Sequence, residues 1–191
     1  MIGRPSRAML ALSIGLAMIV AGVARPVGAS ELDHDAAASG KAVWTEVRWP
    51  FRMDEWGIGR AFVCKAADCG SDVALYLRTK VGFCNCTSGV TDDDELDRVG
   101  DLPLLSNAFV GLAEGRGVAV AGMSGRSRPY QVSLPLWQSQ TAVAVVLHAK
   151  CDAMVATIVA DRDRLAAAEQ NGLAFLGGPS VLQWAKMALG S

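Results

Sequence analysis

Two neighbouring apolar runs, 141–149 and 153–160, place the strongest constraint on what this 191-residue chain can fold into. Both are rich in β-branched residues, and neither shows the polar alternation of a strand with one side in water. Only the segment 150–152 separates them, which is the spacing of a turn between paired strands. The sequence therefore predicts two adjacent central strands, with Val145 and Ile158 in the core.

The clearest alternating pattern covers residues 73–83. Polar side chains at Tyr76, Arg78 and Lys80 alternate with less polar ones, which predicts a strand with one buried and one solvent-facing side. We therefore expect Arg78 and Lys80 to face water. The expected buried set is Val73, Leu75, Leu77, Thr79, Val81 and Phe83.

Weaker period-two patterns predict strands over 43–52, 60–64, 118–121 and 130–134, with 122–129 as a loop before the last of these. The first strand contains Pro50, which cannot donate a ladder hydrogen bond, so we expect this strand to lie at a sheet edge or to end there. Together the patterns predict an antiparallel sheet of about five or six strands.

Helices are expected around this sheet. Thr91 followed by four carboxylates is typical of a helix start, because the carboxylates favour the N-terminal end of the helix dipole. A short helix is expected within 102–112, and another over 163–170 that ends at Asn171-Gly172. The last helix of the chain is expected to begin after Gly177-Gly178-Pro179.

The C-terminal helix carries a start signal and an apolar stripe. Ser180 and Gln183 have the spacing of a capping box. An apolar stripe at helical spacing predicts packing on the sheet. The stripe comprises Val181, Trp184, Ala185 and Ala188. We expect a single α+β domain over residues 41–191, with helices mainly on one face of the sheet and one or two disulfides.

The first 29 residues have the pattern of an export signal. Arg4 and Arg7 precede an uncharged apolar run over 9–24, which is shorter than the about 20 residues of a transmembrane helix. Small residues at 27–29 predict cleavage before Ser30. The alternative is an uncleaved membrane anchor.

Cleavage would change the charge and leave a short leader over 30–40, which we expect to be mobile. Loss of three arginines lowers the Lys and Arg count from 18 to 15 against 19 acidic residues, a net charge near -4. A domain of that sign has no general attraction for nucleic acid or anionic lipid. We expect no membrane span after cleavage and a periplasmic or secreted location, where cysteines form disulfides.

The five cysteines are an odd number, so not all of them can pair within the chain. The short spacing of Cys64 and Cys69 suits a disulfide across a tight turn, worth about 2 kcal/mol. Cys151 would pair with Cys84 or Cys86, which closes a loop of about 66 residues and contributes roughly 4 kcal/mol.

Cys84 and Cys86 also allow a functional interpretation. Side chains two apart on a strand point the same way, so both sulfurs could bind one soft metal ion or exchange a disulfide with a partner. The spacing of the cysteines does not match a zinc ribbon.

A few other side chains are candidates for a functional site. His148 lies in an apolar strand and is interpreted as a core residue, while His34 falls in the expected leader. The acidic run 92–97 lacks the glycine of an EF-hand and is interpreted as a solvated helix start. Arg126 and Arg128 could bind an anion. Four aromatic residues either pack in the core and at its rim or line a ligand groove: Trp44, Trp49, Phe51 and Trp56.

Short motifs in the first half of the mature chain resemble a group of exported proteobacterial proteins of unknown function. The motifs are Trp49-Pro50-Phe51, Cys69-Gly70, Leu75-Tyr76-Leu77-Arg78 and Gly82-Phe83-Cys84-Asn85-Cys86. A looser similarity extends to the C-terminal helix. The resemblance implies a Gram-negative cell envelope and carries no activity.

These patterns favour a non-enzymatic binding or accessory protein of the cell envelope, without a cofactor, that acts on an envelope partner or a small ligand. The second hypothesis is a thiol-based metal-binding or redox protein that acts through Cys84 and Cys86. The third is an enzyme that uses a cysteine or His148.

Overall fold

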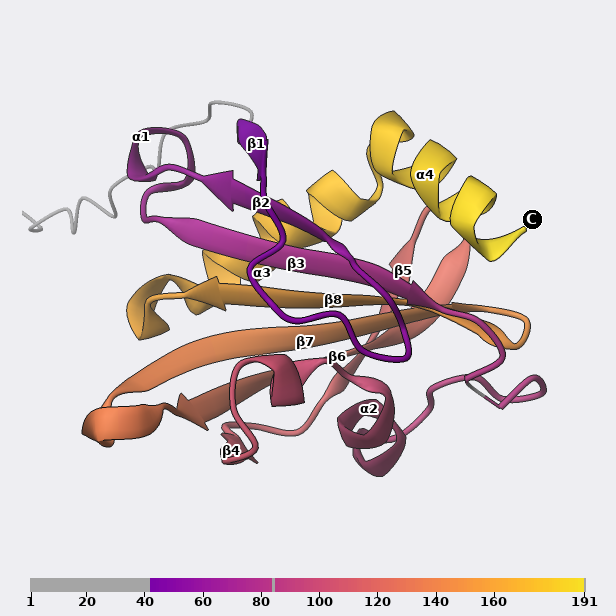
Figure 1. Cartoon of the computed structure of the whole chain (residues 1–191), viewed down its shortest axis with the longest axis horizontal. Coiled ribbons are helices and arrows are strands. Elements are labelled where there is room, and N and C mark those ends of the chain that lie inside the picture. The colour runs from indigo at the N-terminus through magenta and orange to yellow at the C-terminus, as the bar shows by residue number, and fades with distance from the viewer. Residues whose placement is uncertain (1–41, 84, 191) are drawn as a thin grey trace, which may run out of the picture. The chain divides into compact units, whose positions relative to one another are not determined.

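The computed structural model describes residues 42–83 and 85–190, which form one α+β domain around an antiparallel sheet (Figure 1). Eight strands lie within these residues: β1 (Trp44–Val47), β2 (Arg60–Cys64), β3 (Val73–Lys80), β4 (Phe109–Gly111), β5 (Arg116–Val120), β6 (Met123–Ser133), β7 (Ser139–Ala149) and β8 (Asp152–Ala160). The helices are α1 (Ala66–Cys69), α2 (Asp93–Val99), α3 (Leu165–Leu176) and α4 (Pro179–Leu189), with 3-10 turns η1 (Leu102–Leu104), η2 (Pro135–Trp137) and η3 (Arg162–Arg164).

The strand order is β1-β2-β3-β8-β7-β6-β4, and β5 pairs with another part of β6. The two apolar runs form β7 and β8, which pair directly through a two-residue turn at 150–151 and lie near the middle of the sheet. Val145 and Ile158 are fully buried. The prediction of a central strand pair is confirmed, and so is the edge position of β1.

The expected sheet of about five or six strands is too small, since the described residues form eight. Two segments also differ from the prediction. Residues 123–129 form the N-terminal part of β6 rather than a loop, and from Ser124 onward they pair with β7. The turn before them is only Ala121-Gly122, and both residues have positive φ, 49° and 85°. The expected helix within 102–112 is only the turn η1, and strand β4 follows it.

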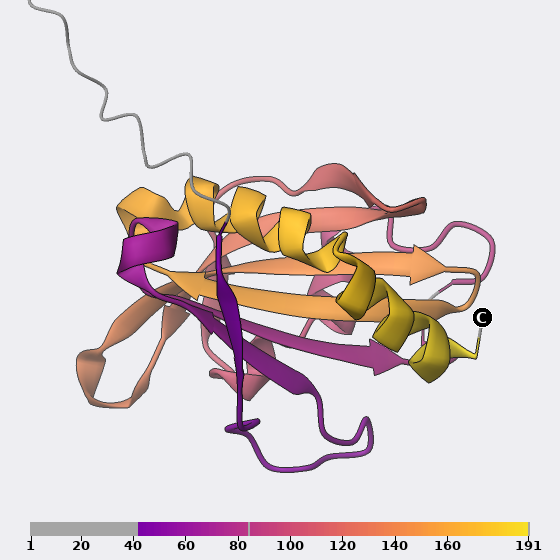
Figure 2. The ribbon, with the colours of Figure 1, turned by 90° about the horizontal axis from the view of Figure 1, so that it is seen from above.

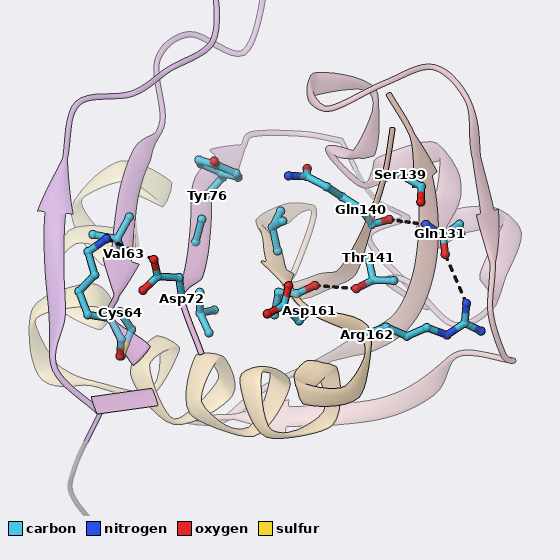
Figure 3. Close-up of a pocket in the computed structure, with 15 residues that line it drawn as sticks. Val63, Cys64, Asp72, Tyr76, Gln131, Ser139, Gln140, Thr141, Asp161 and Arg162 are labelled. Atoms are coloured by element: carbon cyan, nitrogen blue, oxygen red, sulfur yellow. Dashed lines mark hydrogen bonds and ion pairs between the residues drawn. The ribbon is translucent and has the colours of Figure 1, made fainter. Parts of the chain in front are cut away.

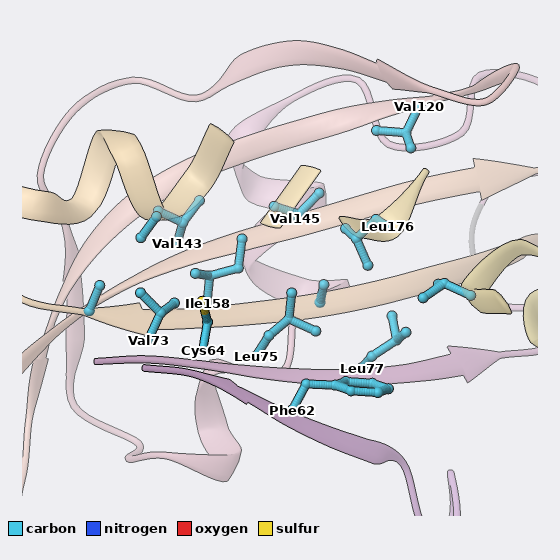
Figure 4. Packing of buried hydrophobic residues seen from close by; sticks show 14 of the residues in the cluster. Phe62, Cys64, Val73, Leu75, Leu77, Val120, Val143, Val145, Ile158 and Leu176 are labelled. Atoms are coloured by element: carbon cyan, nitrogen blue, oxygen red, sulfur yellow. The ribbon is translucent and has the colours of Figure 1, made fainter. Parts of the chain in front are cut away.

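Helices α3 and α4 cover one face of the sheet, which we call the helix face (Figure 2). Figure 4 shows the apolar core beneath them, where Leu75, Val145 and Ile158 meet Leu176. Gly172 does not end the helix, contrary to the prediction, since α3 continues to Leu176. A Cβ at Gly172 would lie 2.4 Å from Ile158 Cδ1, so this glycine allows close packing on β8.

Two predicted helix caps are also wrong. Asp92, rather than Thr91, caps α2, and its Oδ1 accepts from Glu95 N at 2.8 Å. Helix α4 starts at Pro179 after Gly178, and no side chain caps it, so there is no capping box at Ser180. Proline at this position needs no partner for a backbone N–H. Of the expected stripe, Val181 and Ala185 are buried, Trp184 is half-buried and Ala188 is exposed.

The opposite face carries a second core beneath α2 and η1, which we call the second face. Arg78 and Lys80 point into this face and are each only 4% exposed, so the expectation that they face water is wrong. The alternating pattern correctly places them opposite Leu75 and Leu77. It does not reveal that distant segments cover that side.

Candidate functional site

A groove of about 540 Å³ lies at the end of the sheet where β3 begins and β8 ends (Figure 3). Its lining comes from β2, β3, β6, β7 and β8 and the residues that flank them. The groove is therefore assembled from strands that are far apart in the sequence. Such a volume is within the range of pockets that bind small molecules.

The floor of the groove is a row of small apolar residues on neighbouring strands. Val63 on β2 lies opposite Ala74 on β3, and Ala74 lies opposite Val159 on β8. Directly paired residues share one face of a sheet, so these three side chains form a continuous apolar strip on the second face. All three are half-buried. The strip offers a surface for the apolar part of a ligand.

Tyr76 stands beside this strip, two residues along β3 from Ala74, and forms a wall of the groove. Its ring packs edge-on against Phe51 at 4.8 Å and Trp49 at 6.1 Å between centroids. Burial raises the pKa of Tyr76, which keeps its hydroxyl neutral. No described residue hydrogen-bonds this hydroxyl, so it can donate to or accept from a ligand.

Trp49 and Phe51 belong to a loop over 48–59, and a buried ionic cluster fixes this loop to β3. Arg78 Nη1 donates to both carboxylate oxygens of Asp54 in the loop, at 2.7 and 2.9 Å. Desolvation opposes ionisation of Asp54, yet the bonds from Arg78 and Trp56 N leave the pKa of Asp54 below its usual value. The loop therefore holds Trp49 and Phe51 against the ring of Tyr76, on the side away from the groove.

The inner part of this cluster centres on Asp101, which follows α2. Arg78 Nε and Nη2 donate to its two carboxylate oxygens at 2.5 and 2.7 Å. Lys80 Nζ lies 2.8 Å from Asp101 Oδ1 and donates to Val99 O at 2.8 Å. Each buried charge thus has an opposite partner, as burial requires.

Two of the charged residues at the rim lie on the β2–β3 side of the groove. Lys65 Nζ and Asp72 Oδ2 are 3.5 Å apart, and Asp72 Oδ1 accepts from Ala66 N at 3.0 Å. The disulfide between Cys64 and Cys69 encloses Lys65 and α1 on the same side. This part of the rim is consequently tied to the end of β2.

The other side of the rim is formed by Asp161 and Arg162 after β8, Gln131 on β6 and Gln140 at the start of β7. Arg162 Nη1 donates to Gln131 Oε1 at 3.5 Å, and Gln131 Nε2 donates to Gln140 O at 2.9 Å. Asp161 is exposed, and its carboxylate has no hydrogen bond or ion pair to any described residue. The side chain of Gln140 is also without a described partner. These two groups remain for a ligand.

The structure pairs Cys64 with Cys69 and Cys86 with Cys151. The second bond ties the segment after β3 to the β7–β8 turn. Because its sulfur is bonded to Cys151, Cys86 has no thiolate to offer a metal ion. Cys84 lies outside the described residues, within which no three His, Cys, Asp or Glu side chains are grouped to hold a metal.

The arginines expected to bind an anion are on β6, and carboxylates of α2 already engage them. Arg126 Nε lies 2.6 Å from Asp93 Oδ1, and Arg128 Nη1 lies 3.3 Å from Asp97 Oδ2. Tyr130 donates its hydroxyl to Asp97. An anion at these arginines would have to compete with both carboxylates.

The remaining candidates are spread over the domain. The half-buried ring of His148 lies against Gly89, and His34 falls outside the described residues. Trp44 stacks on Phe175 of α3, with 5.0 Å between centroids. Trp56 packs on Phe83. Of the four aromatic residues considered from the sequence, Trp49 and Phe51 thus lie behind the groove wall, and none lines the groove.

A smaller apolar hollow of about 160 Å³ lies beside α4, with Lys186 at its border. None of the described helices has both the length and the apolarity needed to cross a membrane. No family model matches the chain, and no curated protein is similar to it.

Proposed function

We propose that this chain is an exported binding protein of the cell envelope and that it holds a small ligand in the groove. The observation that carries the proposal is the groove itself, with an apolar floor and hydrogen-bonding groups around it. The lining is more polar than that of a typical small-molecule site, which suits a ligand that forms hydrogen bonds as well as apolar contacts.

Export is supported by the N-terminal pattern and by the two disulfides, which are typical of oxidising compartments. The resemblance to exported proteobacterial proteins favours the periplasm of a Gram-negative cell.

The groove is held in shape before a ligand arrives. The loop over 48–59 supports Tyr76 and is fixed by the bonds between Arg78 and Asp54. The Cys64–Cys69 disulfide restrains the end of β2 on the other side. A site that is already organised pays less conformational entropy when it binds.

Substitution Ala74→Trp tests the proposal, because an indole on the middle residue of the floor would fill the groove. The control is Val110→Trp on β4, which places the same side chain at an exposed position. The disulfide-bonded proteins are dialysed to equilibrium against a periplasmic small-molecule extract, and retained compounds are measured by mass spectrometry.

We expect the wild type and Val110→Trp to retain the same compound, and Ala74→Trp to lose it. Equal retention by Ala74→Trp, or no retention by the wild type, would contradict the proposal. Both variants are also checked for cooperative unfolding, so that loss of the fold is not mistaken for loss of the site.

A further inference from the structure

We infer that the ligand of the groove carries a positively charged amine beside an apolar body. This inference rests on the proposed function and names the class of ligand. The juxtaposition that carries it is the unpaired carboxylate of Asp161 next to the apolar strip of Val63, Ala74 and Val159.

The first argument is the balance of charge at the rim. Lys65, Asp72 and Arg162 each have a hydrogen-bond or ion-pair partner within the described residues. Asp161 has none, so its carboxylate is the one charged group lining the described groove that lacks a partner. A ligand ammonium would gain an ion pair there without breaking an existing contact.

The second argument is the position of Asp161. It comes directly after β8 and two residues beyond Val159, which belongs to the floor. Residues two apart along an extended strand point to the same side. If a ligand amine binds Asp161, the apolar body of the ligand would lie over Val159 and Ala74. Tyr76 would then contact the far end of the ligand.

Anionic ligands fit less well. A carboxylate or phosphate would need Lys65 or Arg162. Lys65 already has Asp72 as its counter-ion, whereas Arg162 bonds only the neutral amide of Gln131 but directly follows Asp161 in the chain. The unpaired carboxylate of Asp161 would also repel an anionic ligand. Neutral polyols could use the hydroxyl of Tyr76 and the amide of Gln140, but they would not gain an ion pair with Asp161.

Three probes of nearly equal shape separate these classes: benzylamine, benzyl alcohol and benzoate. Each is titrated into the disulfide-bonded wild-type protein, and backbone amide chemical shifts report both the site and the dissociation constant. We expect benzylamine to shift the amides of Ala74, Val159 and Asp161 saturably. Because exposed ion pairs are weak, it should bind about 2- to 5-fold more tightly than benzyl alcohol.

Asp161→Asn should remove this advantage of benzylamine over benzyl alcohol. The matched control is Asp163→Asn, two residues away, where the carboxylate is exposed and near Arg164 and does not line the groove. This control should keep the advantage.

Equal or tighter binding of benzyl alcohol or benzoate in the groove would overturn the amine inference and leave the proposed binding function standing. If no probe shifts the groove amides, the result counts against both. An advantage of benzylamine that survives Asp161→Asn would also contradict the assignment of the charge to Asp161.

Discussion

The two faces of the sheet are built in different ways from the same strands. On the helix face, α3 and α4 bury an apolar cluster, and the half-buried Glu169 of α3 bonds Ser127 and Arg116 beside it. On the second face, loops and the short helix α2 cover the strands, and Arg78, Lys80 and Asp101 are buried among them. The groove opens at the end where this covering stops. Regular helices thus pack closely on one face, whereas the irregular cover of the other face leaves the larger groove open.

The largest effect should come from a charge on the helix face. Val145 is fully buried on β7, so Val145→Asp would place a carboxylate in an apolar core without a partner. We expect a loss of more than about 4 kcal/mol, enough to abolish folding. Soluble yield and thermal unfolding measure it, with Val110→Asp on the exposed strand β4 as the control. A Val145→Asp protein that melts near the wild type would show that the faces are assigned wrongly.

The second face should be sensitive to loss of a charge instead. Asp101→Asn keeps the shape but leaves Lys80 buried without a counter-ion and Arg78 with Asp54 alone, which should cost about 3–5 kcal/mol. Chemical denaturation gives the change in the free energy of unfolding. Glu46→Gln removes the more exposed ion pair with Arg60 and should cost less than about 1 kcal/mol. Equal losses in the two variants would mean that burial of the cluster is unimportant.

Removal of the disulfides should lower the free energy of unfolding by a smaller amount. The double substitution of Cys86 and Cys151 by serine opens a sequence separation of 65 residues, and we expect a loss of about 2–4 kcal/mol. The corresponding change at Cys64 and Cys69, separated by 5 residues, should cost about 2 kcal/mol or less. Denaturation with and without reductant measures both. If the two losses are equal, or if reductant leaves either difference intact, chain entropy is not the cause.

The smallest effect concerns pH. The N–H of Gly115, helped by Arg126 and Arg128, holds the pKa of Asp93 below its ordinary value of 3.8 despite some desolvation. A carboxyl whose pKa is lowered by folding adds stability above its ordinary pKa and loses it as the pH falls through the folded value. Asp93→Asn should therefore cost up to about 1 kcal/mol at pH 7 and less below pH 3.8. A loss that grows toward low pH would contradict this sign.

Local patterns in the sequence are sufficient to predict the two central strands. The runs that form β7 and β8 are apolar on both sides because both faces of the sheet are covered there, and that property is visible residue by residue. The same approach failed for Arg78 and Lys80. Their shared partner Asp101 is 23 residues from Arg78 along the chain, so the local alternation predicts a solvent-facing side.

Local sequence patterns do not predict the groove. Its floor depends on the pairing of Val63 with Ala74 and of Ala74 with Val159, which only the strand order determines. None of these residues has a chemical type that attracts attention by itself. Asp161 is noticeable only because the structure leaves its carboxylate without a partner, a property that no sequence pattern encodes.

A map of backbone amide shifts tests most directly whether the second face holds the ligand and the helix face serves for packing. The wild-type protein is recorded with and without the periplasmic small-molecule extract. We predict that the largest changes fall on the ends of β2, β3, β7 and β8 around Val63, Ala74 and Val159. Changes centred on α3 and α4, including the hollow beside α4, or no changes at all, would contradict the account.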